Sequence, residues 1–248
     1  MVSLMLKFIE MEFFKLKNSK VFLLILLGSI APAFLVHFGF SGRIDYGEKI
    51  TFALLSGQTN LYMLAIFGLF LTTIVVSYMF SREFNEHTLK SILPTPISRS
   101  KYLIGKSVAF LIWILILCSV CFFSSVIFSY ITGVEGISAN LILKYYGEML
   151  IGGVLLFMVM TPIMFISMLM KSMVPAMICA ATLSLGNLFA YGHDPAVFYP
   201  WILPAIVSSG EIVEYTSNIS MVYGLIAITF ITGLGLTYYH LTQKDIRL

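Results

Sequence analysis

The sequence predicts an all-α integral membrane protein. Of its 248 residues, 59% are hydrophobic and only 11% are charged, whereas soluble domains average about 25% charged residues. The charges leave uncharged stretches between them, and six of these are long enough to cross a bilayer as helices, which takes roughly 20 residues each. These observations exclude a soluble enzyme, a secreted domain and a nucleic-acid-binding protein, because each needs a far more charged surface.

The first predicted element is a helix over residues 1–20 that lies in the membrane interface. Val2, Met5, Ile9, Phe13 and Leu16 recur at helical spacing, with lysines on the opposite side. This amphipathic pattern is typical of a helix whose apolar side rests on the acyl chains while its lysines face anionic headgroups. The alternative is an ordinary cytosolic extension before the first span.

Six membrane spans follow within a single membrane domain that covers residues 1–248. We expect them at residues 21–40, 60–80, 102–132, 147–170, 173–191 and 219–240. Cys118, Cys121 and Cys179 all lie in these apolar runs. We interpret them as buried apolar side chains and not as a disulfide framework or a metal site.

The distribution of positive charge predicts the orientation of the spans. With both termini in the cytoplasm, twelve of the 15 Lys and Arg residues lie on the inner side and three, Arg43, Lys49 and Lys144, on the outer side. Lys and Arg are enriched in cytoplasmic connections. We therefore predict a multi-pass protein of the cell (cytoplasmic) membrane with both termini inside.

The most polar stretch, residues 81–106, connects spans two and three. Glu83 and Glu86 come early, Lys90 follows Glu86 by four residues, and Pro94 and Pro96 stop the pattern, which indicates a short helix over 83–93. A helix exposed below a membrane bundle suits docking of a partner, although a passive connector is the alternative. The residues we assign to docking are Arg82, Glu83, Phe84, Asn85, Glu86, His87, Thr88, Leu89 and Lys90.

Two short patterns in this stretch mimic other sites. Gly105-Lys106-Ser107 resembles the end of a phosphate-binding loop, but Ser100 stands where that loop needs its first glycine,. Glu83 and Glu86-His87 lack the second histidine of a zinc-hydrolase helix,. Because no acid–histidine pair lies in mid-membrane either, we expect no catalytic residues, metal or cofactor on this chain, and energy for any pumping must come from a partner.

The connection between spans five and six is unusually apolar. Residues 195–208 form a short hydrophobic stretch broken by Pro200 and Pro204, with Tyr199 and Trp201 beside them. About ten apolar residues are too few to span a bilayer, and they suit a re-entrant segment whose aromatic residues lie in the interfacial belt. We predict such a segment on the outer face, with an ordinary interfacial loop as the alternative.

This layout resembles the permease subunits of type-two ATP-binding-cassette (ABC) exporters. The resemblance is closest in the family's coupling segment, which has an acidic-Thr helix, a Pro-Ile-Ser-Arg turn and a later Gly-Lys. The matching residues are Arg82-Glu83, Glu86-x-Thr88-Leu89-Lys90, Leu93, Pro96-Ile97-Ser98-Arg99 and Gly105-Lys106. Residues 12–20 are also similar to the N-termini of the bacitracin-resistance and lantibiotic-immunity branch.

The resemblance implies a function and partners. Two permease chains, identical or different, form the pathway, and two separate ABC ATPase subunits that bind ATP and Mg dock beneath it through the coupling helix at 83–93. Closure of the ATPases then drives the spans between two states. A pathway without charges suits an amphipathic cargo in contact with membrane lipid, and we expect an antimicrobial peptide such as a lantibiotic or a bacitracin-like compound.

Two other classes of function compete with this interpretation. A non-transporting membrane scaffold or sensor could bind a cytoplasmic partner through the same loop. A membrane-embedded enzyme would need polar catalytic groups facing one another within the spans, and the sequence shows none.

Overall fold

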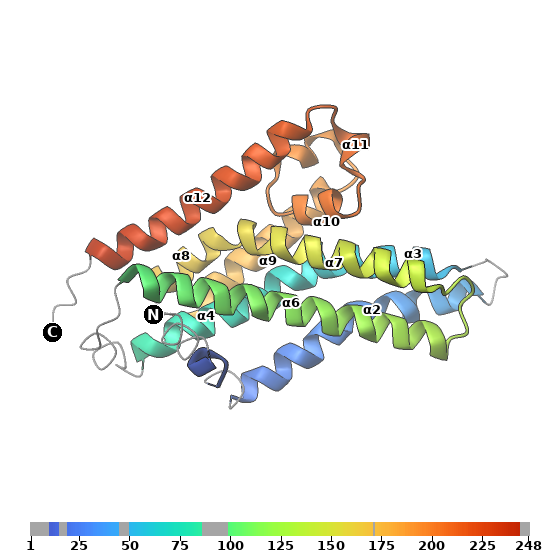
Figure 1. Ribbon diagram of the computed structural model, residues 1–248, viewed down its shortest axis with the longest axis horizontal. Helices are drawn as coiled ribbons and strands as arrows, with labels where there is room; N and C mark the ends of the chain where they lie inside the picture. The colour runs from blue at the N-terminus through green and yellow to red at the C-terminus, as the bar shows by residue number, and fades with distance from the viewer. Residues whose placement is uncertain (1–9, 15–18, 45–49, 86–98, 171, 244–248) are drawn as a thin grey trace.

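Figure 1 shows a computed structural model of the chain as a bundle of long helices. The structure describes residues 10–14, 19–44, 50–85, 99–170 and 172–243. Every regular element in these ranges is helical, apart from one isolated bridge between Thr51 and Glu135. The prediction of an all-α membrane protein is therefore confirmed.

The helices follow one another with short connections. After one helical turn at residues 10–14, the elements are α2 (Lys20–Ile44), α3 (Phe52–Tyr62), the π-helix η1 (Met63–Phe67), α4 (Gly68–Asn85), α6 (Arg99–Ile131), α7 (Ala139–Val159), α8 (Thr161–Met170), α9 (Met173–Ala190), the 3₁₀ helix η2 (Asp194–Phe198), α10 (Leu203–Ser208), α11 (Ile212–Tyr215) and α12 (Ile219–Gln243).

Six helices in the described ranges are long and apolar enough to cross a membrane. They cover Val21–Phe40, Phe52–Phe80, Arg99–Ile131, Ala139–Val159, Met173–Ala190 and Ile219–Gln243. The second is the central one, since 72% of its most apolar window is buried, against 17% for the last. Figure 1 shows α12 running obliquely to the other long helices. It packs against α8, and its exposed face includes Tyr223, Ile228 and Ile231.

Two spans differ from their expected boundaries. The second span begins at Phe52 instead of residue 60, because α3, η1 and α4 form one continuous helical path. The fourth, expected over 147–170, is two helices that meet at Met160. Pro162 has no N–H and cannot continue the hydrogen-bond ladder of α7, which accounts for the break. At its other end α7 begins at Ala139 and therefore also contains Lys144.

The π-helix in the second span is held by polar side chains of α9. A π-turn leaves carbonyl groups without their usual partners. The Asn187 side chain donates to the Ala65 carbonyl at 2.6 Å, and the Ser184 hydroxyl donates to the Ile66 carbonyl at 3.4 Å. Gly68 follows, where a Cβ would lie 2.6 Å from the Met63 carbonyl oxygen and 2.8 Å from Leu156, so this close approach requires glycine.

Interhelical hydrogen bonds join the spans elsewhere in the bundle. His37 of α2 contacts the Ser129 hydroxyl of α6 at 3.0 Å, Thr59 meets Ser125 at 3.3 Å, and Ser77 meets Ser167 at 3.0 Å. Such bonds between small polar side chains hold membrane helices together where lipid offers no hydrophobic driving force.

Candidate functional site

The predicted docking residues fall at the end of α4 and beyond it. Residues 82–85 form the last helical residues of α4, so they continue the second span without a break. Residues 86–90 and the rest of the predicted helix at 83–93 lie outside the described residues. The structure thus describes the two supports of this segment, the end of α4 and the start of α6 at Arg99.

The end of α4 and the first part of α6 are joined by the buried Lys106 side chain. The Lys106 side chain of α6 is fully buried, and its Nζ donates to the Met79 carbonyl of α4 at 2.5 Å and to Glu12 Oε2 at 3.3 Å. The Nζ also lies 4.9 Å from the centre of the Phe80 ring and 5.3 Å from that of Tyr102. We call Glu12, Met79, Phe80, Tyr102 and Lys106 the inner anchor.

The inner anchor satisfies a charge that could not otherwise be buried. An isolated ammonium in an apolar interior is very unfavourable, whereas one that is paired and hydrogen-bonded is tolerated. Glu12 and its neighbours therefore have to stay against the bundle. The sequence placed Lys106 in a Gly-Lys motif and among the positive charges of the inner side, but it did not indicate a buried ion pair; the available signal was a lysine just inside an apolar helix.

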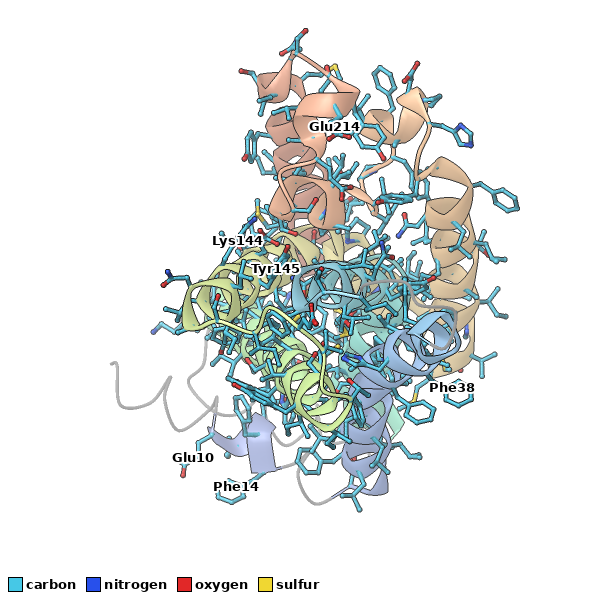
Figure 2. All side chains as sticks on the ribbon, turned by 90° about the vertical axis from the view of Figure 1, so that its right-hand side faces the viewer. Glu10, Phe14, Phe38, Lys144, Tyr145 and Glu214 are labelled. Carbon is cyan, nitrogen blue, oxygen red and sulfur yellow. The ribbon has the colours of Figure 1, made fainter. Side chains whose placement is uncertain are left out.

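The N-terminal turn packs against α6 through aromatic rings as well. Phe13 stacks on Trp113 with ring centres 5.1 Å apart, and Phe22 of α2 meets the same indole edge-on at 5.5 Å. Glu10 and Phe14 are exposed and point away from the bundle in Figure 2. Phe13 belongs to the predicted apolar side, but the burial of Glu12 was not expected. Whether the helix lies in a membrane interface stays a prediction.

A second basic residue beside the docking segment binds the end of α12. Arg99 is the first residue of α6, and its Nη1 donates to the Leu241 carbonyl at 3.1 Å and the Thr242 carbonyl at 2.6 Å. These carbonyls belong to the last turn of a helix, where they lack helical partners and carry partial negative charge. In Figure 1 the end of α4, the start of α6 and the end of α12 lie at the same end of the bundle.

The predicted outer segment, residues 195–208, is packed into the bundle. It forms η2 and α10, and α10 contacts α7, η1 and α3. Pro204 is buried with the residues around it, whereas Tyr199, Pro200 and Trp201 are half-buried. Irregular backbone in a membrane protein needs such cover from protein, as a re-entrant segment would. Its depth in a bilayer stays a prediction.

Two residues of α9 fix this segment in place. The Asn187 side chain donates to the Trp201 carbonyl at 3.2 Å as well as to the Ala65 carbonyl of η1, so it joins the outer segment to the central span. The Tyr199 hydroxyl donates to the Leu183 carbonyl at 3.1 Å, and its ring lies over Gly186. The sequence reasoning did not identify Asn187, a lone amide in an apolar helix.

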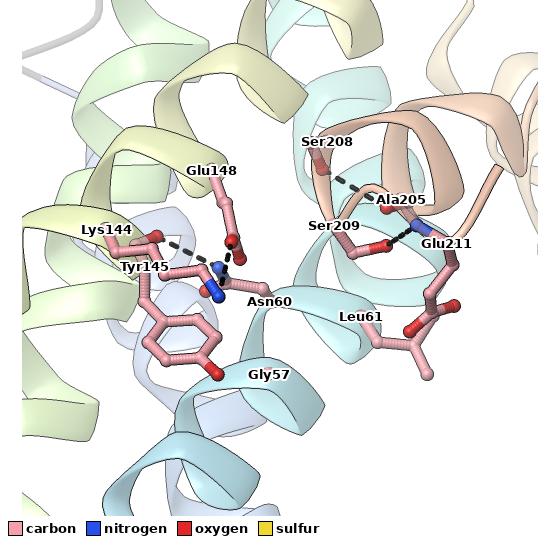
Figure 3. Close-up of a pocket in the computed structure, with 10 residues that line it drawn as sticks. All are labelled: Gly57, Asn60, Leu61, Lys144, Tyr145, Glu148, Ala205, Ser208, Ser209 and Glu211. Carbon is pink, nitrogen blue, oxygen red and sulfur yellow. Dashed lines mark hydrogen bonds and ion pairs between the residues drawn. The ribbon is translucent and has the colours of Figure 1, made fainter. Parts of the chain in front are cut away.

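A small polar cavity lies beside α10. Its volume is about 140 Å³, and Figure 3 shows its lining, which includes Asn60 of α3, Lys144 and Glu148 of α7, Ser208 at the end of α10, and Glu211. Lys144 Nζ lies 3.8 Å from Glu148 Oε1. We call this space the outer cavity.

Glu211 has a hydrogen-bond partner outside the cavity. The hydroxyl of Tyr191, the residue that follows α9, donates to Glu211 Oε2 at 3.1 Å. Burial, and next the negative charge of Glu211, raise the pKa of Tyr191 to about 12. The hydroxyl therefore stays protonated and keeps donating at neutral pH.

A larger groove runs along the side of the bundle between α6 and α7. Its volume is about 600 Å³, and its lining is mostly apolar, with Ile116, Phe123 and Leu150 beside Ser119 and Tyr146. A groove of this kind, open at the side of two spans, suits the apolar part of a lipid or an amphipathic molecule.

Comparison with known proteins agrees with this architecture. Residues 8–187 match the family model described as ABC-2 family transporter protein. The bacitracin transport permease protein BCRB of Bacillus licheniformis is 32% identical over 198 residues, which cover 79% of this chain and 94% of that protein. The family match includes every residue of the inner anchor and the central span. The chain belongs to the ABC-2 family of transporter proteins, in the branch of the bacitracin permease.

Proposed function

We propose that the chain is the membrane-spanning permease subunit of an ABC exporter that removes an amphipathic peptide antibiotic from the bacterial cell membrane. ATP and Mg are bound and hydrolysed by separate ABC ATPase subunits, and a second permease chain, identical or not, completes the pathway. The similarity to a bacitracin permease carries the proposal. Bacitracin-like peptides and lantibiotics are accordingly the cargoes to test first.

The inner anchor supports a mechanical coupling. The docking segment at 82–90 can transmit force to the spans only if it is rigidly attached to them. Lys106 provides such an attachment, because it joins α4, α6 and the N-terminal turn beside this segment. Arg99 adds the end of α12. A push by the ATPases on this segment would therefore move four parts of the chain together, as a two-state rearrangement requires.

The apolar groove between α6 and α7 supports the choice of an amphipathic peptide as cargo. It combines apolar side chains with the hydroxyls of Ser119 and Tyr146, which suits a molecule that is partly apolar and partly polar. An inorganic ion would instead need charged or carbonyl-lined sites along its path.

The exporter function is tested in a peptide-sensitive Gram-positive host. Cells that express the chain with its ATPase should tolerate several-fold more bacitracin or lantibiotic than cells with an ATPase variant that binds but does not hydrolyse ATP. Equal sensitivity of the two strains to every peptide tested, with both proteins present in the membrane, would overturn the proposal. Partner binding without protection would instead indicate the scaffold or sensor.

The docking role of residues 82–90 has its own test. The Glu86→Arg variant should lose co-purification with the ATPase, because it reverses the charge of the predicted docking helix. Glu214→Arg makes the same change on an exposed residue of α11, in the outer connection, and should leave co-purification intact. If both variants retain the ATPase equally, the docking assignment is wrong.

The predicted topology belongs to the proposal too. Both termini and residues 82–90 face the cytoplasm, and the outer segment at 195–208 faces outward. Single cysteines at Ser100 and Ser217, introduced into a variant without native cysteines, should react with a membrane-impermeant maleimide only from inside and only from outside, respectively. The reverse labelling pattern would invert the orientation.

A further inference from the structure

Spans two and four are both interrupted, and they run in the same direction along the bundle. In span two the interruption is the π-helix η1, which separates α3 from α4. In span four it is the break between α7 and α8 at Met160. Sharp bends in helices occur mainly at π-turns and at prolines, and these two interruptions are of those two kinds, since Pro162 follows the break.

Contacts between the two spans place the interruptions at nearly the same level. A Cβ on Gly152 of α7 would overlap the Leu64 side chain of η1, and a Cβ on Gly68 would lie 2.8 Å from Leu156. Glycine at both positions lets the two backbones approach closely. η1 therefore packs against the last turns of α7, and the break in span four follows about one helical turn later.

The helices on either side of this level are bonded to each other across the two spans. On the side of the docking segment, the hydroxyls of Ser77 in α4 and Ser167 in α8 form a hydrogen bond at 3.0 Å. On the opposite side, the Asn60 amide of α3 donates to the Tyr145 carbonyl of α7 at 3.0 Å. The interruptions thus separate one bonded pair, α4 with α8, from another, α3 with α7.

The break in span four is held by a hydroxyl with more acceptors than hydrogens. Pro162 offers no N–H to the Met158 carbonyl, and the Thr161 hydroxyl lies 2.9 Å from it as a donor,. The same hydroxyl lies 3.3 Å from the Thr229 carbonyl and 3.2 Å from the Phe230 carbonyl of α12. A hydroxyl has one hydrogen, so this bond can exchange between α7 and α12 when the helix bends.

The interruption in span two is also held by side chains of another helix. Asn187 and Ser184 of α9 donate to the Ala65 and Ile66 carbonyls of η1. A side chain can follow a carbonyl when the turn opens, whereas a backbone N–H is fixed in its helix. The Asn187 side chain is fully buried, and its Oδ1 has no hydrogen-bond partner among the described residues, so its bonding in this arrangement is incomplete.

We propose that η1 and the α7–α8 break form one hinge, about which α4 and α8 bend together relative to α3 and α7. This inference rests on the proposed function, because the ATPases supply the push through the docking segment at 82–90, whose first residues continue α4. The bond between α4 and α8 carries the movement to span four. α6 runs unbroken past the hinge and tilts as a rod with its inner end fixed to α4 by Lys106.

The hinge is tested by distances between spin labels in the complex with the ATPase in lipid nanodiscs. Labels at Leu143 and Leu169 lie on either side of the break in span four. Labels at Ile104 and Ile131 are separated by nearly the same number of residues on the unbroken α6 and serve as the control. All four side chains are exposed. The labelled chain is diluted with unlabelled chain, so that only distances within one chain are measured.

ATP binding to an ATPase variant that does not hydrolyse it should change the distance in span four. We expect a change of about 2 Å or more, as in other hinge movements, and no change along α6. An unchanged distance in span four, or the same change in both helices, would overturn the hinge.

A third pair of labels tests whether the two spans bend together. Leu54 of α3 and Tyr78 of α4 lie on either side of η1 in span two. Their distance should change on ATP binding as the distance in span four does. A change in span four alone would show that η1 is not part of the hinge.

The Pro162→Ala variant separates bending from stability. Alanine restores an N–H for the Met158 carbonyl and makes span four stiffer, so the melting temperature should stay unchanged or rise. ATP-dependent protection of cells should nevertheless be lost, together with the distance changes in both spans. Pro32→Ala makes the same substitution within the continuous helix α2 and should retain protection.

Full protection by a stable Pro162→Ala chain would overturn the hinge. If the variant has a lower melting temperature, the distances in the parent chain decide alone. The hinge and the exporter also fail separately. Fixed distances in spans two and four of a chain that protects cells remove the hinge and leave the exporter, whereas ATP-dependent bending in a chain that protects against no peptide removes the cargo assignment and leaves the hinge.

Discussion

The Lys106 ammonium lies 3.3 Å from the Glu12 carboxylate, although 94 residues separate the two in the chain. Both side chains are almost completely buried, and Lys106 also donates to the Met79 carbonyl. This ion pair fastens the N-terminal turn to the two helices that flank residues 86–98. Any force applied to that connection therefore reaches α4, α6 and the N-terminus together.

The first prediction concerns this ion pair. Lys106→Met should lower the free energy of unfolding by about 3–5 kcal/mol, because the buried Glu12 carboxylate loses the ammonium that lies 3.3 Å from it,. Glu12→Leu combined with Lys106→Met should recover most of the loss, since two apolar side chains of similar volume replace the pair. Thermal unfolding of detergent-purified protein measures both effects.

Transport should respond differently from stability. If the anchor couples the ATPase to the bundle, the stable double variant still loses ATP-dependent protection of cells, because apolar side chains do not replace the bond from Lys106 of α6 to the Met79 carbonyl of α4. Full protection by the double variant would show that the ion pair serves folding alone. Glu10→Leu changes an exposed carboxylate of the same turn and is the matched control for both measurements.

The second prediction concerns Arg99 and the end of α12. Arg99→Gln should make the last turn of α12 less stable by about 1 kcal/mol, because the carbonyls of Leu241 and Thr242 lose a charged donor,. Hydrogen–deuterium exchange should then speed up at residues 238–243 and remain unchanged in α9. Arg99→Lys keeps the charge but not the planar guanidinium, so its exchange should lie between those of Arg99→Gln and the parent.

The helices of this protein could be predicted because composition alone determines them. Long uncharged stretches have to be helical in a membrane, where every backbone group needs an internal partner. Their boundaries were harder to predict, since Lys144 and Glu148 lie inside α7. Those charges are tolerated because they face the outer cavity, which is a property of the tertiary structure.

The residues of the candidate sites also fall into two groups, those that a local sequence pattern indicates and those whose partners depend on how the helices pack. The local pattern of prolines and aromatic residues predicts the outer segment around Tyr199, Pro200, Trp201 and Pro204, and its role stays a prediction. Lys106, Asn187 and Asn60 could not be found from such a pattern, because each bonds a backbone carbonyl on another helix. A sequence shows which polar residue lies in an apolar run, but its partner is determined by how the helices pack.

The third prediction concerns Asn187, which joins η1 to the outer segment. Asn187→Leu should lower the free energy of unfolding by about 1–3 kcal/mol, because the buried carbonyls of Ala65 and Trp201 lose their donor,. Asn140→Leu, at an exposed position in the first turn of α7, should change it by less than about 0.5 kcal/mol. Equal melting temperatures of the two variants would show that Asn187 is not a structural link.

The fourth prediction concerns the ionisation of Tyr191. Its pKa is raised from 10 to about 12 in the folded chain by burial and by Glu211. The folded state therefore holds this proton more tightly than the unfolded state, so the contribution to stability is complete below pH 10 and is lost as the pH rises toward 12. In a pH titration followed by absorbance at 295 nm, Tyr191→Phe should remove one of the tyrosines that ionise well above pH 10. Removal of a tyrosine that titrates near pH 10 would contradict this.

The last prediction concerns Gly186, where two effects of a glycine-to-alanine change oppose each other. Alanine is favoured over glycine inside a helix by about 1 kcal/mol. A Cβ at this position, however, would overlap the Tyr199 hydroxyl oxygen and lie 2.7 Å from Cζ, and such overpacking costs about 1–3 kcal/mol. Because the ring is held by its bond to the Leu183 carbonyl, we expect the steric cost to be larger and Gly186→Ala to lower the melting temperature.

Two further variants separate these effects. Gly235→Ala in α12 meets no atom within 4 Å, so it should show only the gain in helix propensity and leave the melting temperature unchanged or slightly raised. Adding Tyr199→Leu to Gly186→Ala removes the far end of the ring, and the double variant should therefore be no less stable than Tyr199→Leu alone. If Gly186→Ala behaves like Gly235→Ala, Tyr199 does not hold the outer segment against α9 in the membrane.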